Sequence, residues 1–298
     1  MNTVKFVPRG YKIALFWARL GFSRFVFCRR GFWALAWGGS IICAVLLLSS
    51  RFCLAADMQE KKSTHFIIYY EGVPEDFVDT VLRYAEGYYS DLTEKLGFRR
   101  FDYWTWDKRA KIYIYPDQET YVERTRQPQW SGGVVSYADK TIWTYPRESG
   151  FFDSLLPHEI GHIVFREVVG SGRGRVPLWL DEGVASYLEE ARRVGANMFI
   201  LKAMKNNTFI PFAQLNGITP DTLRQRTDVD LFYAESVSVI SYLIEKYGVA
   251  AFNDFCKKLR DGKSLDRALS YSYFYLRSAD DLGEFWEREL RDKLKDSR

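Results

Sequence analysis

The feature that most constrains this chain is a pair of histidines four residues apart, His158 and His162. On an α-helix, four residues turn the chain through almost one full circle, so the two imidazoles face the same side. They can then bind one metal ion together. Glu159 projects beside them, where its carboxylate can reach a water molecule on that ion. The spacing therefore predicts a helix that carries a metal centre.

The pattern His-Glu-x-x-His is typical of zinc hydrolases. A catalytic zinc ion takes three protein ligands and keeps a fourth position open. The third histidine of the chain, His65, lies in a β-rich run, where we expect a structural or solvent-facing role. Cys256 is the only cysteine beyond residue 56, so no cysteine cluster can hold the ion. The ligands must therefore be histidine and carboxylate.

The segment after the motif offers a candidate third ligand, Glu182. Pro177 opens a predicted helix, and Leu180 and Val184 belong to its buried stripe. A helical glutamate is ordinarily a surface residue. This one has partly apolar neighbours and follows His162 by twenty residues, after a glycine-rich connection that lets the chain return. We therefore predict that Glu182 completes the metal centre.

These two segments, HEIGH and PLWLDEGVASYLE, resemble those of the gluzincin metallopeptidases, the peptidase MA-like superfamily. In that group one helix carries HExxH, and a second helix carries the third ligand in a Trp-Leu-x-Glu-Gly-x-Ala pattern. The resemblance implies an α+β fold with a thermolysin-like zincin core. It also implies that His158, His162 and Glu182 bind one Zn²⁺ ion, and that Glu159 is the general base for a zinc-activated water.

Two departures from the gluzincin pattern limit what the resemblance implies. Many members carry an aspartate four residues after the ligand glutamate, where it orients a ligand histidine. Ser186 occupies that position here, and a hydroxyl accepts a histidine N–H more weakly than a carboxylate does. The Gly-Ala-Met-Glu-Asn motif, by which aminopeptidase-type members hold a substrate's amino terminus, is absent. The sequence therefore favours an endopeptidase over an exopeptidase.

A tyrosine is the expected donor to the oxyanion that forms during peptide hydrolysis. Gluzincins commonly use a tyrosine or histidine located after the third ligand, and no histidine follows His162. The best candidate is Tyr233, in a predicted helix that runs to Gly248 and resembles the family's helix at this point. Tyr187 and Tyr145 remain alternatives.

Residues 1–56 differ from the rest of the chain in charge. They hold eight basic residues and no acidic ones, whereas the rest holds 34 basic and 38 acidic residues, a net charge of −4. Nothing therefore suggests a nucleic-acid partner. An apolar run, residues 32–48, precedes Ala55-Ala56, an order typical of export signals. We expect a cleaved signal peptide or an uncleaved membrane anchor, with the folded part periplasmic or extracellular.

Residues 57–298 are expected to form one peptidase domain, with a small mixed sheet in residues 64–150 and a helical lobe in residues 151–298. We expect the zinc ion in the cleft between these parts, and residues 57–64 as a short tether. The second strand of a hairpin, residues 140–145, is a candidate free edge for an extended peptide; an ordinary hairpin is the alternative. The predicted elements are strands 65–70, 111–115, 133–137 and 140–145, and helices 74–96, 118–126, one around the motif capped by Asp153 or Ser154, 249–259, 264–271 and 279–295.

The leading functional prediction is an exported zinc metalloprotease that acts on peptide or protein substrates. One alternative is a catalytically inactive binding module with the same fold. The intact Glu159 argues against it, because a module that only binds has no need of a general base. Another alternative is a zinc hydrolase that acts on a non-peptide substrate.

Overall fold

The computed structural model describes residues 58–98, 104, 106–129, 131–170 and 176–296. These residues belong to one compact unit. The predicted leader, residues 1–56, lies outside the described residues, as does most of the glycine-rich connection between the two metal-binding segments. Within the described ranges, no helix is both long and apolar enough to cross a membrane.

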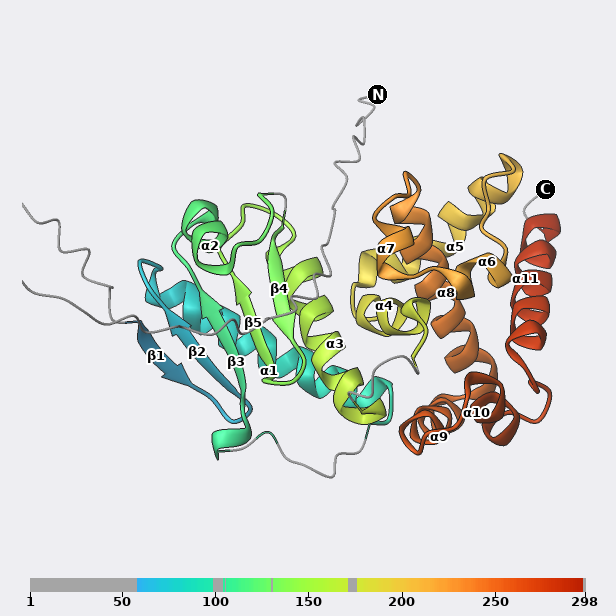
Figure 1. The fold of residues 1–298 in the computed structure, drawn as a ribbon, viewed down its shortest axis with the longest axis horizontal. Helices are drawn as coiled ribbons and strands as arrows, with labels where there is room; N and C mark the ends of the chain where they lie inside the picture. Colours follow the sequence, from blue (N-terminus) through green and yellow to red (C-terminus); the bar gives the residue numbers. More distant parts are fainter. Residues whose placement is uncertain (1–57, 99–103, 105, 130, 171–175, 297–298) are drawn as a thin grey trace, which may run out of the picture. The chain divides into compact units, whose positions relative to one another are not determined.

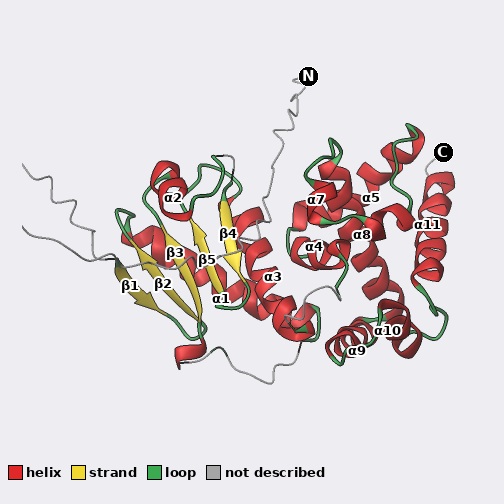
Figure 2. Ribbon diagram, in the orientation of Figure 1, coloured by secondary structure: helices red, strands yellow, loops and turns green. Residues whose placement is uncertain are grey.

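A five-stranded mixed sheet forms the first part of the domain (Figures 1 and 2). The strand order is β1-β2-β3-β5-β4; β2, β3 and β5 run parallel, and the outer strands β1 and β4 pair antiparallel to their neighbours. This confirms the predicted strands and hairpin to within one or two residues at most ends. The strands are β1 Gln59–Lys62, β2 Phe66–Tyr70, β3 Ala110–Ile114, β4 Gly133–Ser136 and β5 Thr141–Thr144.

Two expectations about the sheet are wrong. The second strand of the hairpin, β5, is not an edge, because it pairs with β3 on its other side; the free edge is the first strand, β4. Residues 59–62 are not a tether but the outer strand β1. This strand is polar because it is mostly exposed, and Lys61 forms an ion pair with Glu75. A short charged edge strand carries no apolar signal in the sequence.

Helices pack against the sheet and continue into the second part of the domain (Figure 1). Helix α1, Glu75–Lys95, contacts both β2 and α3, Leu156–Val169. Helix α3 in turn contacts β4, so the motif helix lies beside the free edge of the sheet. Among the described residues, α2, Gln118–Thr125, is the remaining α-helix of this part, and its N-cap is Asp117.

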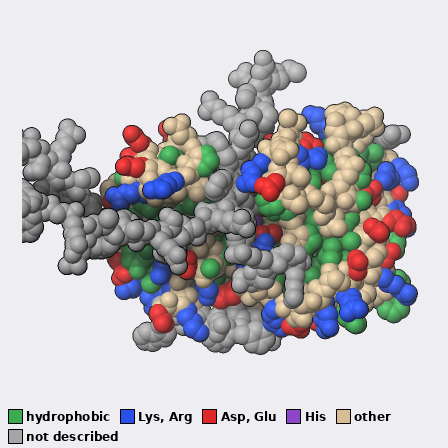
Figure 3. Space-filling model, in the orientation of Figure 1, with side chains coloured by type: hydrophobic (Ala, Val, Ile, Leu, Met, Phe, Trp, Pro, Cys, Tyr) green, Lys and Arg blue, Asp and Glu red, His purple; other side chains and the backbone are tan. Residues whose placement is uncertain are grey.

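The second part is helical, which confirms the predicted α+β architecture. Its central element is α8, which is buried from Leu231 to Ile244 and packs against α4, α5 and α9. Figure 3 shows one face of the molecule, on which acidic and basic side chains are interspersed over this part. The helices are α4 Leu178–Ser186, α5 Glu190–Lys205, α6 Phe212–Gly217, α7 Pro220–Leu223, α8 Val229–Tyr247, α9 Val249–Arg260, α10 Leu265–Ser272 and α11 Ala279–Asp296.

One carboxyl group in α8 is buried without a charged partner. Glu235 is fully buried, and one of its oxygens accepts the backbone N–H of Ile210 at 3.0 Å, while the other has no hydrogen-bond partner. Burial raises the pKa of Glu235 to about 9. The side chain is therefore a neutral acid at neutral pH.

We predict that Glu235→Gln stabilises the protein at pH 8 and leaves its stability nearly unchanged at pH 5. The folded pKa lies above the ordinary value of 4.5, so the unfolded chain loses this proton first as the pH rises. The stability that this proton contributes is complete below about pH 4.5 and is lost progressively towards pH 9. Glutamine keeps the shape and cannot ionise.

Thermal melting at the two pH values measures this effect. The melting temperature of the variant should exceed that of the wild type by several degrees at pH 8 only. An equal difference at both pH values would show that Glu235 is ionised in the folded protein.

Candidate metal centre

The motif helix α3 begins in an unexpected way. A π-helical turn, Phe151–Leu155, runs directly into it, and no side chain caps its first turn. The predicted cap, Ser154, instead donates its hydroxyl hydrogen to Glu189 at 2.6 Å. The expectation of a cap at residue 153 or 154 is therefore wrong, because the chain is already helical there. Pro157 lies in the first turn of α3, where its fixed φ suits the helix. The carbonyl of Phe152 in the preceding turn accepts a hydrogen bond from the Tyr88 hydroxyl instead of from a helical N–H.

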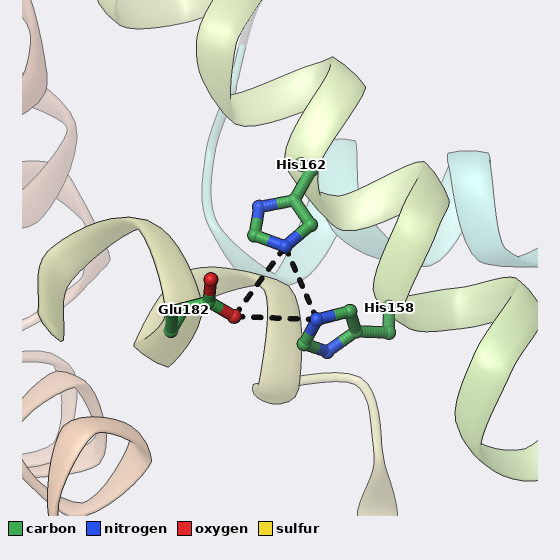
Figure 4. A group of neighbouring side chains, drawn as sticks. All are labelled: His158, His162 and Glu182. Carbon is green, nitrogen blue, oxygen red and sulfur yellow. Dashed lines mark hydrogen bonds and ion pairs between the residues drawn. The ribbon is translucent and has the colours of Figure 1, made fainter. Parts of the chain in front are cut away.

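The three predicted ligands come together in the interior. Nε2 of His158 and Nε2 of His162 lie 3.1 Å apart, and Oε2 of Glu182 lies 3.4 Å from the first and 3.5 Å from the second (Figure 4). All three side chains are buried. The histidines come from α3 and the glutamate from α4, two helices in direct contact. The three form a group suited to one metal ion.

The distances fit a metal ion of the zinc type. Tetrahedral ligands with bonds of about 2.0–2.1 Å lie about 3.3–3.4 Å from one another, close to the three distances observed. Both carboxylate oxygens of Glu182 are buried without a hydrogen-bond partner. A buried carboxylate in that condition is costly unless a cation satisfies it. The donor set therefore matches a bound metal ion.

Each histidine also has a carboxylate near its other ring nitrogen, hydrogen-bonded to His158 and at ion-pair distance from His162. Nδ1 of His158 lies 2.9 Å from Oε1 of Glu189, and Nδ1 of His162 lies 3.3 Å from Oδ1 of Asp181. A proton on each Nδ1 leaves the Nε2 lone pairs free to face the same point. Ser186 does not take this role, because its buried hydroxyl has no hydrogen-bond partner. The sequence alone leaves the orienting group open, and the residues that lie in this position are Glu189 and Asp181.

The charges around the triad favour a divalent cation. With neutral imidazoles, four carboxylates against two guanidinium groups leave two negative charges. Burial alone would lower the pKa of His158, but the nearby carboxylates of Glu182 and Glu189 raise it to about 9. The electrostatic potential at the imidazoles is therefore strongly negative. The carboxylates are Glu159, Asp181, Glu182 and Glu189, and the guanidinium groups are Arg166, which contacts Asp181, and Arg192, which contacts Glu189.

Two glycines let the helices approach closely enough to form the triad. A Cβ on Gly161, between the two histidines, would lie 2.8 Å from Cα of Ala185 in α4. A Cβ on Gly183, next to the third ligand, would lie 2.5 Å from the backbone oxygen of Ser236 in α8. Both contacts are with backbone, which cannot rotate away. The glycines therefore hold α4 between α3 and α8 at the depth where Glu182 meets the histidines.

The predicted catalytic residues also lie in this region. Glu159 is buried, and burial raises its pKa. The Tyr233 ring lies 6.1 Å from the His158 ring. The charges of Glu182, Glu189 and Glu159 contribute to raising the pKa of Tyr233. The electrostatic surroundings of the alternatives, Tyr187 and Tyr145, include none of these carboxylates among their main contributions.

Sequence reasoning missed Tyr137, at the turn after β4. Its ring lies 5.8 Å from the His162 ring, and its hydroxyl is buried without a hydrogen-bond partner. The only sequence feature that could have indicated a position near the triad was the place of Tyr137 at the end of the hairpin strand before the motif. His65, in contrast, lies outside the triad: its Nδ1 pairs with Glu86 at 2.6 Å, and its ring stacks on Tyr89.

We predict that Gly183→Ala weakens metal binding by at least tenfold and lowers the melting temperature. The added methyl group would push α4 away from α8 and move Glu182 off the histidines. Calorimetric titration with Zn²⁺ and thermal melting measure the two effects. Gly195→Ala is the matched control, because a Cβ there meets nothing within 4 Å. It should keep metal affinity and stabilise α5 by about 1 kcal/mol. Wild-type affinity in Gly183→Ala would refute the close-approach argument.

Comparison with known proteins supports the geometry. No curated protein matches the chain. A family model described as the peptidase MA superfamily matches residues 105–291, more than half of the chain. The matched region contains all three residues of the buried triad. Sequence motif, metal-binding geometry and family model agree, and the chain belongs to the peptidase MA superfamily.

Proposed function

We propose that this protein is a zinc-dependent endopeptidase that acts outside the cytoplasm on peptide or protein substrates. The buried group of His158, His162 and Glu182 carries the proposal, because its distances suit one metal ion. Two imidazoles and one carboxylate are a ligand set found in zinc peptidases, where a fourth position stays open. Membership of a peptidase superfamily points to peptide bonds as the substrate.

Glu159 is the proposed general base. A zinc ion bound by the triad supplies Lewis acidity to the attacking water and to the substrate carbonyl. The carboxylate of Glu159 accepts the proton of the attacking water and passes it to the leaving nitrogen. Burial raises its pKa, so the carboxylate is a better proton acceptor than an exposed glutamate.

Tyr233 is the proposed donor to the oxyanion. Its side chain is almost fully buried, and burial raises its pKa well above the ordinary value. The phenol therefore keeps its proton at neutral pH and can donate it in a hydrogen bond. Its ring lies edge-on to His158, on the buried helix α8. Such a donor stabilises negative charge on the carbonyl oxygen during attack.

The free edge of β4 is the proposed binding surface for an extended substrate. Its neighbour on one side is β5, and on the other side its backbone groups have no strand partner among the described residues. Helix α3 contacts this strand, so a peptide paired with β4 would run beside the motif helix. Main-chain hydrogen bonds to an edge strand recognise a peptide independently of its sequence.

The leader supports the proposed location. Residues 1–56 combine basic residues, an apolar run over residues 32–48 and a pair of small residues, Ala55-Ala56. That order is typical of a segment that directs export. We propose that it serves as a signal peptide or as an N-terminal anchor with the peptidase domain outside the cytoplasm.

Two experiments separate this proposal from the alternatives: hydrolysis assays with and without a chelator, and digestion of casein or a peptide library. An inactive binding module would show no chelator-sensitive hydrolysis of any substrate, although the triad is intact. A zinc hydrolase of non-peptide substrates would bind zinc and fail to cleave casein or a peptide library. Glu159, buried beside the triad, favours an enzyme over a module that only binds.

We predict that Glu159→Gln retains zinc and loses at least 10²-fold in the rate of peptide cleavage, because it removes the proton acceptor. Casein or peptide-library digestion measures cleavage, and elemental analysis measures zinc. The matched control is Glu167→Gln on the same helix, whose carboxylate pairs with Lys140 at 2.7 Å; it should cleave at the wild-type rate. Wild-type cleavage by the Glu159 variant would exclude this base.

We also predict that Tyr233→Phe lowers kcat by about 10²-fold and leaves KM and zinc content nearly unchanged, because the donor acts mainly on the oxyanion. Steady-state kinetics on a cleaved peptide measure both constants. Tyr187→Phe removes the hydroxyl of an alternative tyrosine and should leave kcat at its wild-type value. If the two variants exchange these results, Tyr187 is the donor.

A further inference from the structure

We propose that Glu189 is the positioning residue of the metal centre, which fixes the ring of His158 and, through Arg192, the ring of Tyr233. The role towards His158 concerns metal binding alone. The role towards Tyr233 rests on the proposed function, because it matters only if Tyr233 acts in hydrolysis. Both roles follow from the contacts of one buried carboxylate.

Glu189 lies at the junction of α4 and α5, with its side chain 4% exposed. Oε1 faces Nδ1 of His158 at 2.9 Å. Oε2 accepts hydrogen bonds from Oγ of Ser154 at 2.6 Å and from Nε of Arg192 at 3.0 Å. Because each oxygen has its own partners, the carboxylate cannot rotate without breaking a hydrogen bond. It is therefore a fixed acceptor for one defined proton.

This acceptor determines which nitrogen of His158 is free. A proton held on Nδ1 by Glu189 leaves the lone pair of Nε2 directed towards Glu182 and His162. The same hydrogen bond fixes the rotation of the ring about its Cβ–Cγ bond. A carboxylate partner also makes the imidazole a stronger electron donor to a metal ion. Loss of this partner should weaken metal affinity by about 10- to 100-fold.

Arg192 extends this support to Tyr233. Its guanidinium carbon lies 5.1 Å from the centroid of the Tyr233 ring, and its Nε donates to Glu189. Arg192 stands one helical turn after Glu189, so the pair spans the start of α5. The ring of Tyr233 thus packs between the guanidinium group on one side and His158 on another. One network links the proposed oxyanion donor to a metal ligand.

The second histidine has a separate support. Asp181 contacts Nδ1 of His162 and receives two hydrogen bonds from Arg166, at 3.1 and 2.7 Å. Arg166 in turn lies over the ring of Tyr137, not over that of Tyr233. The effects of Glu189 should therefore be confined to His158 and Tyr233.

The test compares Glu189→Gln with Glu190→Gln in the full chain. Glutamine removes the negative charge. Its N–H₂ group also replaces one oxygen that now accepts hydrogen bonds from donors such as Ser154 and Arg192. The expected result is a 10- to 100-fold rise in the dissociation constant for Zn²⁺, measured by competition with a chelating dye. The visible absorption of the Co²⁺-loaded protein should change as well, because it reports ligand geometry. Glu190 is exposed at the start of α5, so its variant should match the wild type in both measurements.

A milder variant keeps the proposal testable if Glu189→Gln does not fold. Ser154→Ala removes one hydrogen bond to Oε2 and leaves the charge. It should raise the Zn²⁺ dissociation constant by about 2- to 10-fold. Arg192→Met, compared with Arg193→Met, tests the link to Tyr233: only the first should lower kcat, by about tenfold, with KM unchanged. Arg193 lies over Tyr187 instead.

The outcomes separate this proposal from the proposed function. If no peptide is cleaved but Glu189→Gln weakens Zn²⁺ binding, the positioning of His158 stands and the peptidase proposal fails. If the wild type cleaves peptides and the folded Glu189 variant binds Zn²⁺ as tightly as the wild type, Glu189 does not position His158. Equal kcat values in Arg192→Met and Arg193→Met would show that Glu189 does not position Tyr233 through Arg192.

Discussion

The structure depends on one buried carboxylate that has no hydrogen-bond partner. Both oxygens of Glu182 are buried, and Oε2 faces the Nε2 atoms of His158 and His162. An unpaired buried charge costs several kcal/mol even after the protein relaxes. A divalent cation at the centre of the three atoms removes that cost and satisfies all three donors together. Metal binding should therefore contribute to the stability of the folded domain as well as to its chemistry.

The fold brings these donors together by close helix packing rather than by a flexible loop. Gly161 and Gly183 remove the side chains that would separate α4 from α3 and α8. Helix α8, buried along most of its length, provides the surface on which α4 rests and also carries Tyr233. Because α3 contacts β4, the free edge of the sheet lies against the same helix as the two histidines. Rigid elements thus position the ligands, the proposed donor and the proposed peptide-binding edge.

The local parts of the site could be predicted from the sequence. The four-residue spacing placed His158 and His162 on one helical face, and the apolar segment around Glu182 indicated a buried acid. The contacts that depend on tertiary structure could not be predicted. Glu189 stands at the start of a helix, where an acidic residue usually faces solvent. Only the packing of α4 against α3 brings Glu189, which follows α4, to His158. The family spacing offered only the weaker hydroxyl of Ser186 at the expected position.

The same distinction applies to the fold. Strongly periodic helices such as α1 and α11 follow from their apolar stripes, whereas α5 has apolar residues on several sides and no clear stripe. The identity of the edge strand depends on whether β5 pairs with β3, which no local pattern records. Likewise, β1 is a strand because β2 offers it hydrogen bonds, although its own residues are polar.

The central claim is that His158, His162 and Glu182 bind a single zinc ion. Anomalous diffraction at the zinc edge, from crystals of the zinc-loaded full chain, tests it most directly. The account predicts one strong peak about 2.0–2.2 Å from Nε2 of each histidine and from a carboxylate oxygen of Glu182, with Glu189 still bonded to Nδ1 of His158. No peak at the triad, or a peak bound by other residues, would contradict it.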